Sequence, residues 1–215
     1  MTRLILVRHG QSEANAQGIG AGQLDYPLTE LGRHQAELTA AYLAEHERVD
    51  VIYASDLRRA YDTALPLAKR LGLTVHTDPA LREIHSGLFA GMRFSERNER
   101  FPEEIARLRS DFSHMRYPKG EYIPEVYDRV VGCISRIAQQ HEGECVLIAT
   151  HAGAVRMFQA FAEGFSREEA GNVSSGDNAS LHIYEWDGAR ASVLVHNFTD
   201  HLKDATSFAE ELSRI

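Results

Sequence analysis

The stretch that decides the fold is Leu4-Ile5-Leu6-Val7-Arg8-His9-Gly10-Gln11-Ser12-Glu13-Ala14-Asn15. Its four consecutive aliphatic residues predict a short strand that is buried on both faces. The strand ends at Arg8, His9 and Gly10, and open α/β sheets bind ligands at the carboxyl ends of their strands. Arginine can bind phosphate, histidine can attack or move protons, and glycine lets a ligand approach the backbone. The stretch therefore predicts a central strand with a ligand site at its end, and Ser12 is expected to cap a helical turn after it.

Strands and helices alternate along the rest of the chain. We expect strands at 49–54, 73–76 and 145–150, and helices at 29–44, 55–70, 123–143 and 154–163. This alternation predicts parallel strands joined by right-handed crossovers. Residues 181–186 and 191–196 flank Asp187-Gly188, a hairpin signal that adds one antiparallel strand. The predicted fold is therefore a three-layer α/β/α sandwich around a mostly parallel open sheet.

Residues 95–117 differ from the rest in being polar and rich in arginine and glutamate. Their apolar residues recur at helical spacing and predict one amphipathic helix, lying over the sheet edge as a lid. We thus expect a single domain over residues 1–215, with a helical lid insertion at about 90–120 and a terminal helix from Asp200. The glycines of 18–22 are followed by a turn and not by a helix, so we expect a flexible loop beside the site and no dinucleotide loop.

The composition narrows the class of protein. The chain has 215 residues, a hydrophobic fraction of 43% and a net charge of −8, which fits a globular protein without affinity for nucleic acid or acidic membranes. We expect no membrane span, because no apolar run is long enough, and the apolar start is too short for a signal peptide. Cys133 and Cys145 fit the core of a reduced cytosolic protein. We therefore expect a cytoplasmic protein with a small-molecule partner, and the sequence leaves a homodimer open.

Two of the predicted strands end in histidine, at His9 and His151. Because parallel strands end at the same edge of a sheet, we expect these side chains to meet. The helix after Ser55 would bring Arg59 and a positive dipole end to the same place, which suits a phosphate dianion. Glu83, after the third strand, could protonate a leaving oxygen. This set suits phosphoryl transfer without a metal or another cofactor, and no metal-ligand spacing such as His-x-His occurs in the sequence.

Five motifs, in order along the chain, resemble those of the histidine phosphatase superfamily, which includes the cofactor-dependent phosphoglycerate mutases. They are Arg8-His9-Gly10 with Asn15, Pro27-Leu28-Thr29-Glu30-Leu31-Gly32, the segment from Ser55 to Ala64, Leu81-Arg82-Glu83-Ile84 and Thr150-His151-Ala152-Gly153. The resemblance implies a phosphoglycerate mutase-like fold, His9 as a nucleophile that becomes phosphorylated, and Glu83 as the general acid. It also implies a set of residues that bind the phosphoryl group and the substrate, namely Arg8, Arg59 and His151, assisted by Asn15, Gly22 and Ala152.

The predicted function is a phosphatase that hydrolyses a small phosphomonoester through phosphohistidine. One alternative is a phosphoglycerate mutase, although the longer, basic and proline-rich lid of the mutases is absent. Another is a catalytically idle module that binds a phosphorylated ligand, against which the intact His9, Glu83 and His151 argue; an NAD- or metal-dependent enzyme is the weakest. The sequence does not choose among ribazole phosphate, sugar phosphates and phosphoglycerates as substrate. Residues of the polar segment that could recognise it are Arg93, Arg97 and Arg100.

Overall fold

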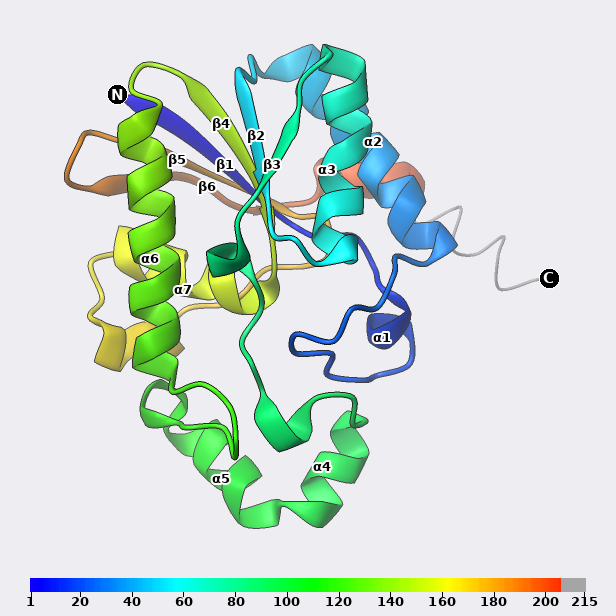
Figure 1. Ribbon diagram of the computed structural model, residues 1–215, viewed down its shortest axis with the longest axis vertical. Coiled ribbons are helices and arrows are strands. Elements are labelled where there is room, and N and C mark those ends of the chain that lie inside the picture. The colour runs from blue at the N-terminus through cyan, green and yellow to red at the C-terminus, as the bar shows by residue number, and fades with distance from the viewer. Residues whose placement is uncertain (206–215) are drawn as a thin grey trace.

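A six-stranded mixed sheet forms the centre of the computed structural model, which describes residues 1–205 (Figure 1). The strands are β1 (Thr2–Arg8), β2 (Val51–Ala54), β3 (Val75–Thr77), β4 (Cys145–Thr150), β5 (Leu181–Trp186) and β6 (Ala191–Phe198). Their order is β3-β2-β4-β1-β5-β6, and the first four strands in this order are parallel to one another. Strand β5 runs antiparallel to both of its neighbours, β1 and β6. The predicted sheet, mostly parallel with one antiparallel strand, is confirmed.

Helices cover both faces of this sheet, as Figure 1 shows. They are α2 (Glu30–His46) and α3 (Arg58–Leu71) on one face, and α6 (Ile123–Gln140) and α7 (Ala152–Ala162) on the other. Strand β1 separates the two cores because its side chains alternate: Leu4 and Leu6 pack with residues of α6 and α7, and Ile5 and Val7 pack with residues of α2 and α3. The run of aliphatic residues in β1 is therefore explained by burial on both faces, and the three-layer sandwich is confirmed.

Helix α3 begins later than the sequence predicts. Ser55 and Asp56 are good capping residues, but the first helical residue is Arg58, and Leu57 at the N-cap makes no side-chain hydrogen bond. The two expected caps are engaged elsewhere: the Ser55 hydroxyl contacts a histidine after β4, and Asp56 forms an ion pair with an arginine that follows β3. Gly72 ends the helix with a φ of 68°, a left-handed conformation that glycine adopts without strain.

The single helix predicted over residues 95–117 is wrong. The segment forms α4 (Phe94–Arg100), α5 (Pro102–Ser110) and a 3₁₀ turn, Phe112–His114. Helix α4 ends because the residue before a proline avoids helical geometry, and Phe101 has φ −135° and ψ 53°. Pro102 then occupies the first turn of α5, where its missing N–H costs nothing. Figure 1 shows α4 and α5 together at one end of the molecule, apart from the four helices that cover the sheet.

The remaining elements are short. Helix α1 (Glu13–Ala16) is capped by Ser12, whose hydroxyl accepts from the Asn15 amide at 3.2 Å, as predicted. Further 3₁₀ turns are Pro79–Leu81, Gly87–Phe89, Arg167–Asn172 and Asp200–Leu202. Most of the helix expected after Asp200 lies outside the described residues. Within residues 1–205, no helix combines the length and the apolar character that a membrane crossing requires.

Candidate active site

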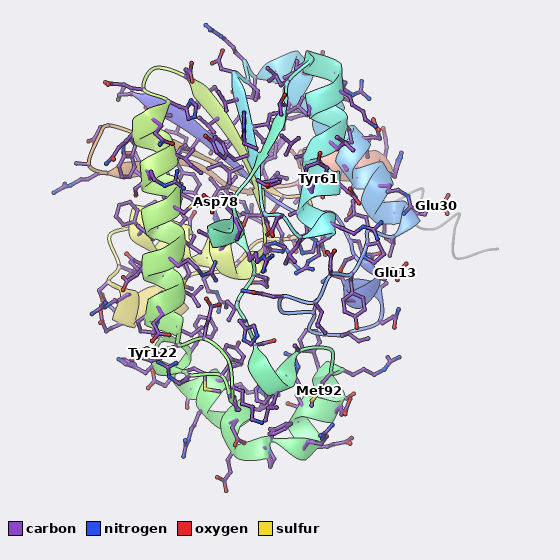
Figure 2. All side chains as sticks on the ribbon, viewed as in Figure 1. Glu13, Glu30, Tyr61, Asp78, Met92 and Tyr122 are labelled. Carbon is purple, nitrogen blue, oxygen red and sulfur yellow. The ribbon has the colours of Figure 1, made fainter. Side chains whose placement is uncertain are left out.

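A cavity of about 260 Å³ lies where β1 ends and α7 begins. Seven of the eight predicted site residues line it: Arg8, His9, Asn15, Gly22, Arg59, Glu83 and Ala152. The eighth, His151, is fully buried behind the wall, and its ring centroid lies 5.2 Å from that of His9. Figure 2 shows all the described side chains around this region, between α1, marked by Glu13, and the segment before α4, marked by Met92. The predicted meeting of the two histidines is therefore observed.

His9 is held in one tautomer by its surroundings. Its Nδ1 lies 2.7 Å from the Gly10 carbonyl oxygen and therefore carries the proton that it donates. Its Nε2 accepts from Arg59 Nε at 3.3 Å. Burial, and then the charge of Arg59, hold the pKa of His9 well below its ordinary value. The ring is accordingly neutral, and its unprotonated Nε2 lies at the cavity, where release of the Arg59 contact frees the lone pair for attack.

Only 1% of Arg59 is exposed, and three hydrogen bonds within the protein fix its guanidinium group. Besides its contact with His9, it donates from Nη1 to the Leu24 carbonyl and from Nη2 to the Gly22 carbonyl, each at 2.8 Å. The loop of residues 18–24 therefore serves as the acceptor that orients this guanidinium. Gly22 thus contacts Arg59 through its carbonyl, in addition to lining the cavity.

Arg8 supplies a second cation beside His9. Its Nη1 donates to the Gly176 carbonyl at 2.6 Å, and its buried Nε has no acceptor within the described chain. Burial lowers the pKa of this guanidinium, which nevertheless stays charged at any ordinary pH. Two arginines with in-plane N–H groups beside a neutral histidine can bind an anion at that histidine.

His151 is oriented by a serine rather than by a carboxylate. Its Nε2 lies 2.8 Å from Ser55 Oγ, and its buried Nδ1 has no partner among residues 1–205. Burial is the largest cause that lowers the pKa of His151, followed by the charge of Arg59. An unpaired polar atom in a buried position indicates that a bound ligand can complete the contact. Ser55 is a residue of the site that capping rules assign to another role.

Glu83 reaches the same cavity from the loop after β3. Its Oε1 accepts from the amides of Gly153, at 3.0 Å, and Ile84, at 2.9 Å. A Cβ added at Gly153 would overlap this oxygen and would lie 2.7 Å from Ile84 Cγ1. Glycine is therefore required at the start of α7 for Glu83 to approach the helix N-terminus. The sequence quotes Gly153 in a motif without indicating this contact.

Asn15 and a second asparagine join β1 to a later loop. Asn15 Oδ1 accepts from the Ser12 amide at 3.0 Å, and Asn178 Nδ2 lies 3.3 Å from the same oxygen. Asn178 also donates to the His9 carbonyl at 2.9 Å. Asn178 was not predicted, because it is more than 160 residues from its partners and no local pattern marks it.

The far side of the cavity is lined by side chains from several other elements. They are Ser86, Phe94, Arg97, Phe112, Tyr117 and Arg156. Of the three arginines named as candidates for substrate recognition, Arg97 lines the cavity, whereas Arg93 donates to the Gln17 carbonyl and Arg100 pairs with Glu96. The donors of the site are guanidinium groups, imidazoles and amides. Within the described part of the chain, no three His, Cys, Asp or Glu side chains gather as a metal site.

Comparison with known proteins gives concordant matches. The family model of the histidine phosphatase superfamily (branch 1) matches residues 4–199. Phosphoserine phosphatase 1 of Hydrogenobacter thermophilus is 34% identical over 202 residues, which cover 94% of this chain and 95% of that protein. The metal-independent phosphoserine phosphatase of Arabidopsis thaliana is 37% identical over 158 residues, 73% of this chain and 66% of that protein. A solved mycobacterial glucosyl-3-phosphoglycerate phosphatase, in complex with VO3, has a TM-score of 0.84 at 30% identity, covering 92% of this chain and 99% of that one.

Proposed function

The chain belongs to the histidine phosphatase superfamily (branch 1) and is a phosphatase; from this premise we propose that His9 is its nucleophile and that the substrate is a small phosphomonoester. The observation that supports this assignment best is the state of His9. Its Nδ1 proton is directed at the Gly10 carbonyl, and its Nε2 lies beside Arg59 in the cavity. A buried neutral imidazole of fixed tautomer can attack phosphorus without first losing a proton.

The phosphoryl group is held by Arg8, Arg59 and His151 in this proposal. Two atoms in this set, Arg8 Nε and His151 Nδ1, are buried without a partner among the described residues. Equatorial phosphoryl oxygens would accept from the guanidinium groups, and the amide of Ala152 at the start of α7 adds a donor near the positive end of the helix. Cations that neutralise the equatorial oxygens are the main requirement for phosphoryl transfer.

Glu83 is the acid and then the base. In the first step His9 Nε2 forms a bond to phosphorus, the ester P–O bond breaks, and Glu83 gives its proton to the leaving oxygen. The positive charge on the phosphorylated ring is stabilised by the Gly10 carbonyl at Nδ1. In the second step Glu83 takes a proton from water, the water oxygen bonds to phosphorus, and the P–N bond breaks. Phosphate leaves and neutral His9 is restored.

We further propose that residues 1–215 form one domain in which residues 90–120 act as a lid. Phe94 and Arg97 of α4, with Phe112 and Tyr117 further along, line the cavity, so a movement of this segment would open or cover the site. The substrate is a small phosphorylated metabolite and not a nucleic acid, since the net charge is −8 and four arginines line one small cavity. A cytoplasmic location is supported by two free, buried cysteines.

The test is hydrolysis of p-nitrophenyl phosphate in the presence of EDTA. We expect wild type to turn over and His9→Ala to lose at least about 10³-fold in kcat, because the covalent route is removed. His46→Ala is the matched control, because His46 is an exposed histidine in the last turn of α2, and it should behave as wild type. The trapped phosphoenzyme should lose its phosphate in acid. Retained turnover in His9→Ala would refute the nucleophile, and loss of activity in EDTA would refute metal independence. With a phosphoglycerate in place of p-nitrophenyl phosphate, isomerised product instead of released phosphate would indicate a mutase.

A further inference from the structure

Arg129 of α6 joins two segments of the chain beside the active site. Its Nη1 donates to the carbonyls of Ala80, at 2.8 Å, and Arg82, at 3.0 Å. Its Nε and Nη2 donate to Glu121 Oε1 and Oε2, at 2.9 and 3.0 Å. Only 21% of this side chain is exposed. The planar guanidinium therefore binds the segment that leads to Glu83 through one nitrogen and a carboxylate through the other two.

Glu121 extends this contact to the other side of Glu83. Its Oε2 accepts from the His85 amide at 2.7 Å, and its own amide donates to the His85 carbonyl at 2.9 Å. The chain before Glu83, at residues 80–82, and the chain after it, at His85, are thus bound to the same ion pair. Contacts on both sides of a reactive residue restrict the positions that its side chain can reach.

The backbones of the two segments are also in direct contact. A Cβ added at Gly120 would overlap the His85 carbonyl oxygen, and one added at Gly87 would overlap the Pro118 carbonyl oxygen. Glycine allows this approach at both positions because it has no side chain. The segment that carries Glu83 and the end of the lid segment therefore form one unit, which the hydrogen bonds of Arg129 attach to α6.

This attachment determines where the carboxyl group of Glu83 lies. Glu83 Oε1 accepts from the amides of Ile84 and Gly153, so Oε2 is the oxygen left to carry the proton that a general acid needs. A displacement of the backbone at Glu83 would break the contact with Gly153 and move Oε2 away from the leaving oxygen. Proton transfer is sensitive to such a displacement, because the donor has to be within hydrogen-bonding distance.

We propose that Arg129 is a positioning residue, which holds Glu83 in place for protonation of the leaving oxygen. Among the side chains of α6, all within the described chain, Arg129 alone is hydrogen-bonded to the backbone of residues 79–85. It does not line the cavity, so it acts through this segment and not on the substrate. The inference rests on the proposed function, because it takes Glu83 as the general acid.

Two aryl phosphates that differ in their leaving group test the proposal. Phenolate is a more basic leaving group than p-nitrophenolate, so hydrolysis of phenyl phosphate depends more strongly on a general acid. We would divide kcat/KM for phenyl phosphate by kcat/KM for p-nitrophenyl phosphate, using one preparation of each variant. The concentration of folded enzyme cancels in this ratio, so a loss of stability alone leaves it unchanged.

Variants of Arg129 are compared with a matched arginine. Arg129→Gln removes the charge and the contacts with both carbonyls, and should lower the ratio by about tenfold or more. Arg129→Lys keeps a charge for Glu121 but lacks the planar fork, so its ratio should lie between those of Arg129→Gln and wild type. The control is Arg116→Gln, because Arg116 pairs with Glu125 of the same helix and both side chains are more than half exposed. An unchanged ratio in Arg129→Gln, or an equal fall in the control, would overturn the proposal.

A double-mutant cycle shows whether Arg129 acts through Glu83. Glu83→Gln should lower the ratio, and adding Arg129→Gln should lower it no further, because the group that Arg129 positions is already lost. A further fall in the double variant would contradict the proposal. A ratio that is unchanged in Glu83→Gln would instead refute the acid role of Glu83 in the proposed function.

Hydrogen exchange of the Gly153 amide, measured by NMR, tests the positioning without any catalysis. This amide lies in the first turn of α7, where it has no acceptor within the helix, and it donates to Glu83 Oε1. It should exchange about tenfold faster or more in Arg129→Gln than in Arg116→Gln and wild type. An unchanged exchange rate would refute the positioning role alone. Faster exchange, with aryl phosphate ratios unchanged in Glu83→Gln, would support the positioning role and refute the acid role alone.

Discussion

Replacing Gly153 by alanine should disable the general acid while leaving the fold intact. The new methyl group would overlap Glu83 Oε1 and lie 2.7 and 2.8 Å from Ile84 Cγ1 and Cδ1, so the carboxyl group must move away. Gly153 is helical, and alanine in a helix is favoured over glycine by roughly 0.5–1 kcal/mol, which offsets part of the overlap. Loss of function should therefore exceed loss of stability.

The size of the effect follows from the displacement. A shift of about 1 Å in a reacting group costs on the order of 10²-fold in rate, or roughly 2.7 kcal/mol. The loss should appear in kcat/KM for an alkyl phosphate, whose leaving oxygen needs a proton. It should be much smaller for p-nitrophenyl phosphate, whose leaving group departs readily as an anion.

The assay compares kcat/KM for these two substrates in wild type, Gly153→Ala and Gly132→Ala. Gly132 lies in α6 with no atom within 4 Å of an added Cβ, so its alanine variant should keep full activity and gain stability in urea. An equal loss on both substrates in Gly153→Ala would refute the assignment of Glu83 as the acid for the leaving group. Full activity on both would refute the requirement for glycine.

Three further predictions concern the histidines and Arg59. Ser55→Ala removes the partner of His151 Nε2 and should lower kcat/KM about tenfold, with about 1–3 kcal/mol lost from the free energy of unfolding in urea. Arg59→Lys loses two carbonyl contacts and the planar fork, and should lower kcat/KM for any phosphomonoester by roughly 10²-fold in steady-state assays. Burial lowers the pKa of His182 to about 3 and that of His9 in the same direction. Below pH 6.5 the unfolded chain therefore binds more protons than the folded protein. As the pH falls below this value, each such histidine should reduce the free energy of unfolding by up to about 1.4 kcal/mol per pH unit. Denaturation at pH 7 and at pH 5 measures this difference.

The sequence predicts the central sheet well, because its signals are local. Runs of aliphatic residues mark β1 and β4, and the turn at Asp187-Gly188 marks the hairpin of β5 and β6. The meeting of His9 and His151 follows from parallel pairing, since both histidines come directly after strands that are neighbours in the sheet. The motif resemblance includes Arg59 among the residues that bind the phosphoryl group, and the structure places Arg59 beside His9.

The differences have two kinds of cause. Pro102 causes the break between α4 and α5. This proline is visible in the sequence, but the prediction of one helix follows the helical spacing of the apolar residues and not the proline. The late start of α3 has no local signal, because Ser55 contacts a residue 96 positions away. The same holds for Gly20 and Gly153, whose neighbours come from other elements. Contacts of this kind become visible only when the chain is folded.

The position of β1 in the sheet bears on when the protein can first work during its synthesis. This strand is made before the other five, yet it is hydrogen-bonded between β4 and β5, and β5 ends only at residue 186. Arg8 and His9 also depend on contacts from residues 176 and 178. A nascent chain that has reached only β4 would therefore lack the groups that orient its reactive end. The ribosome must therefore pass residue 186 before β1 acquires both of its neighbours, so the reactive end of β1 cannot be oriented while the chain is shorter than this.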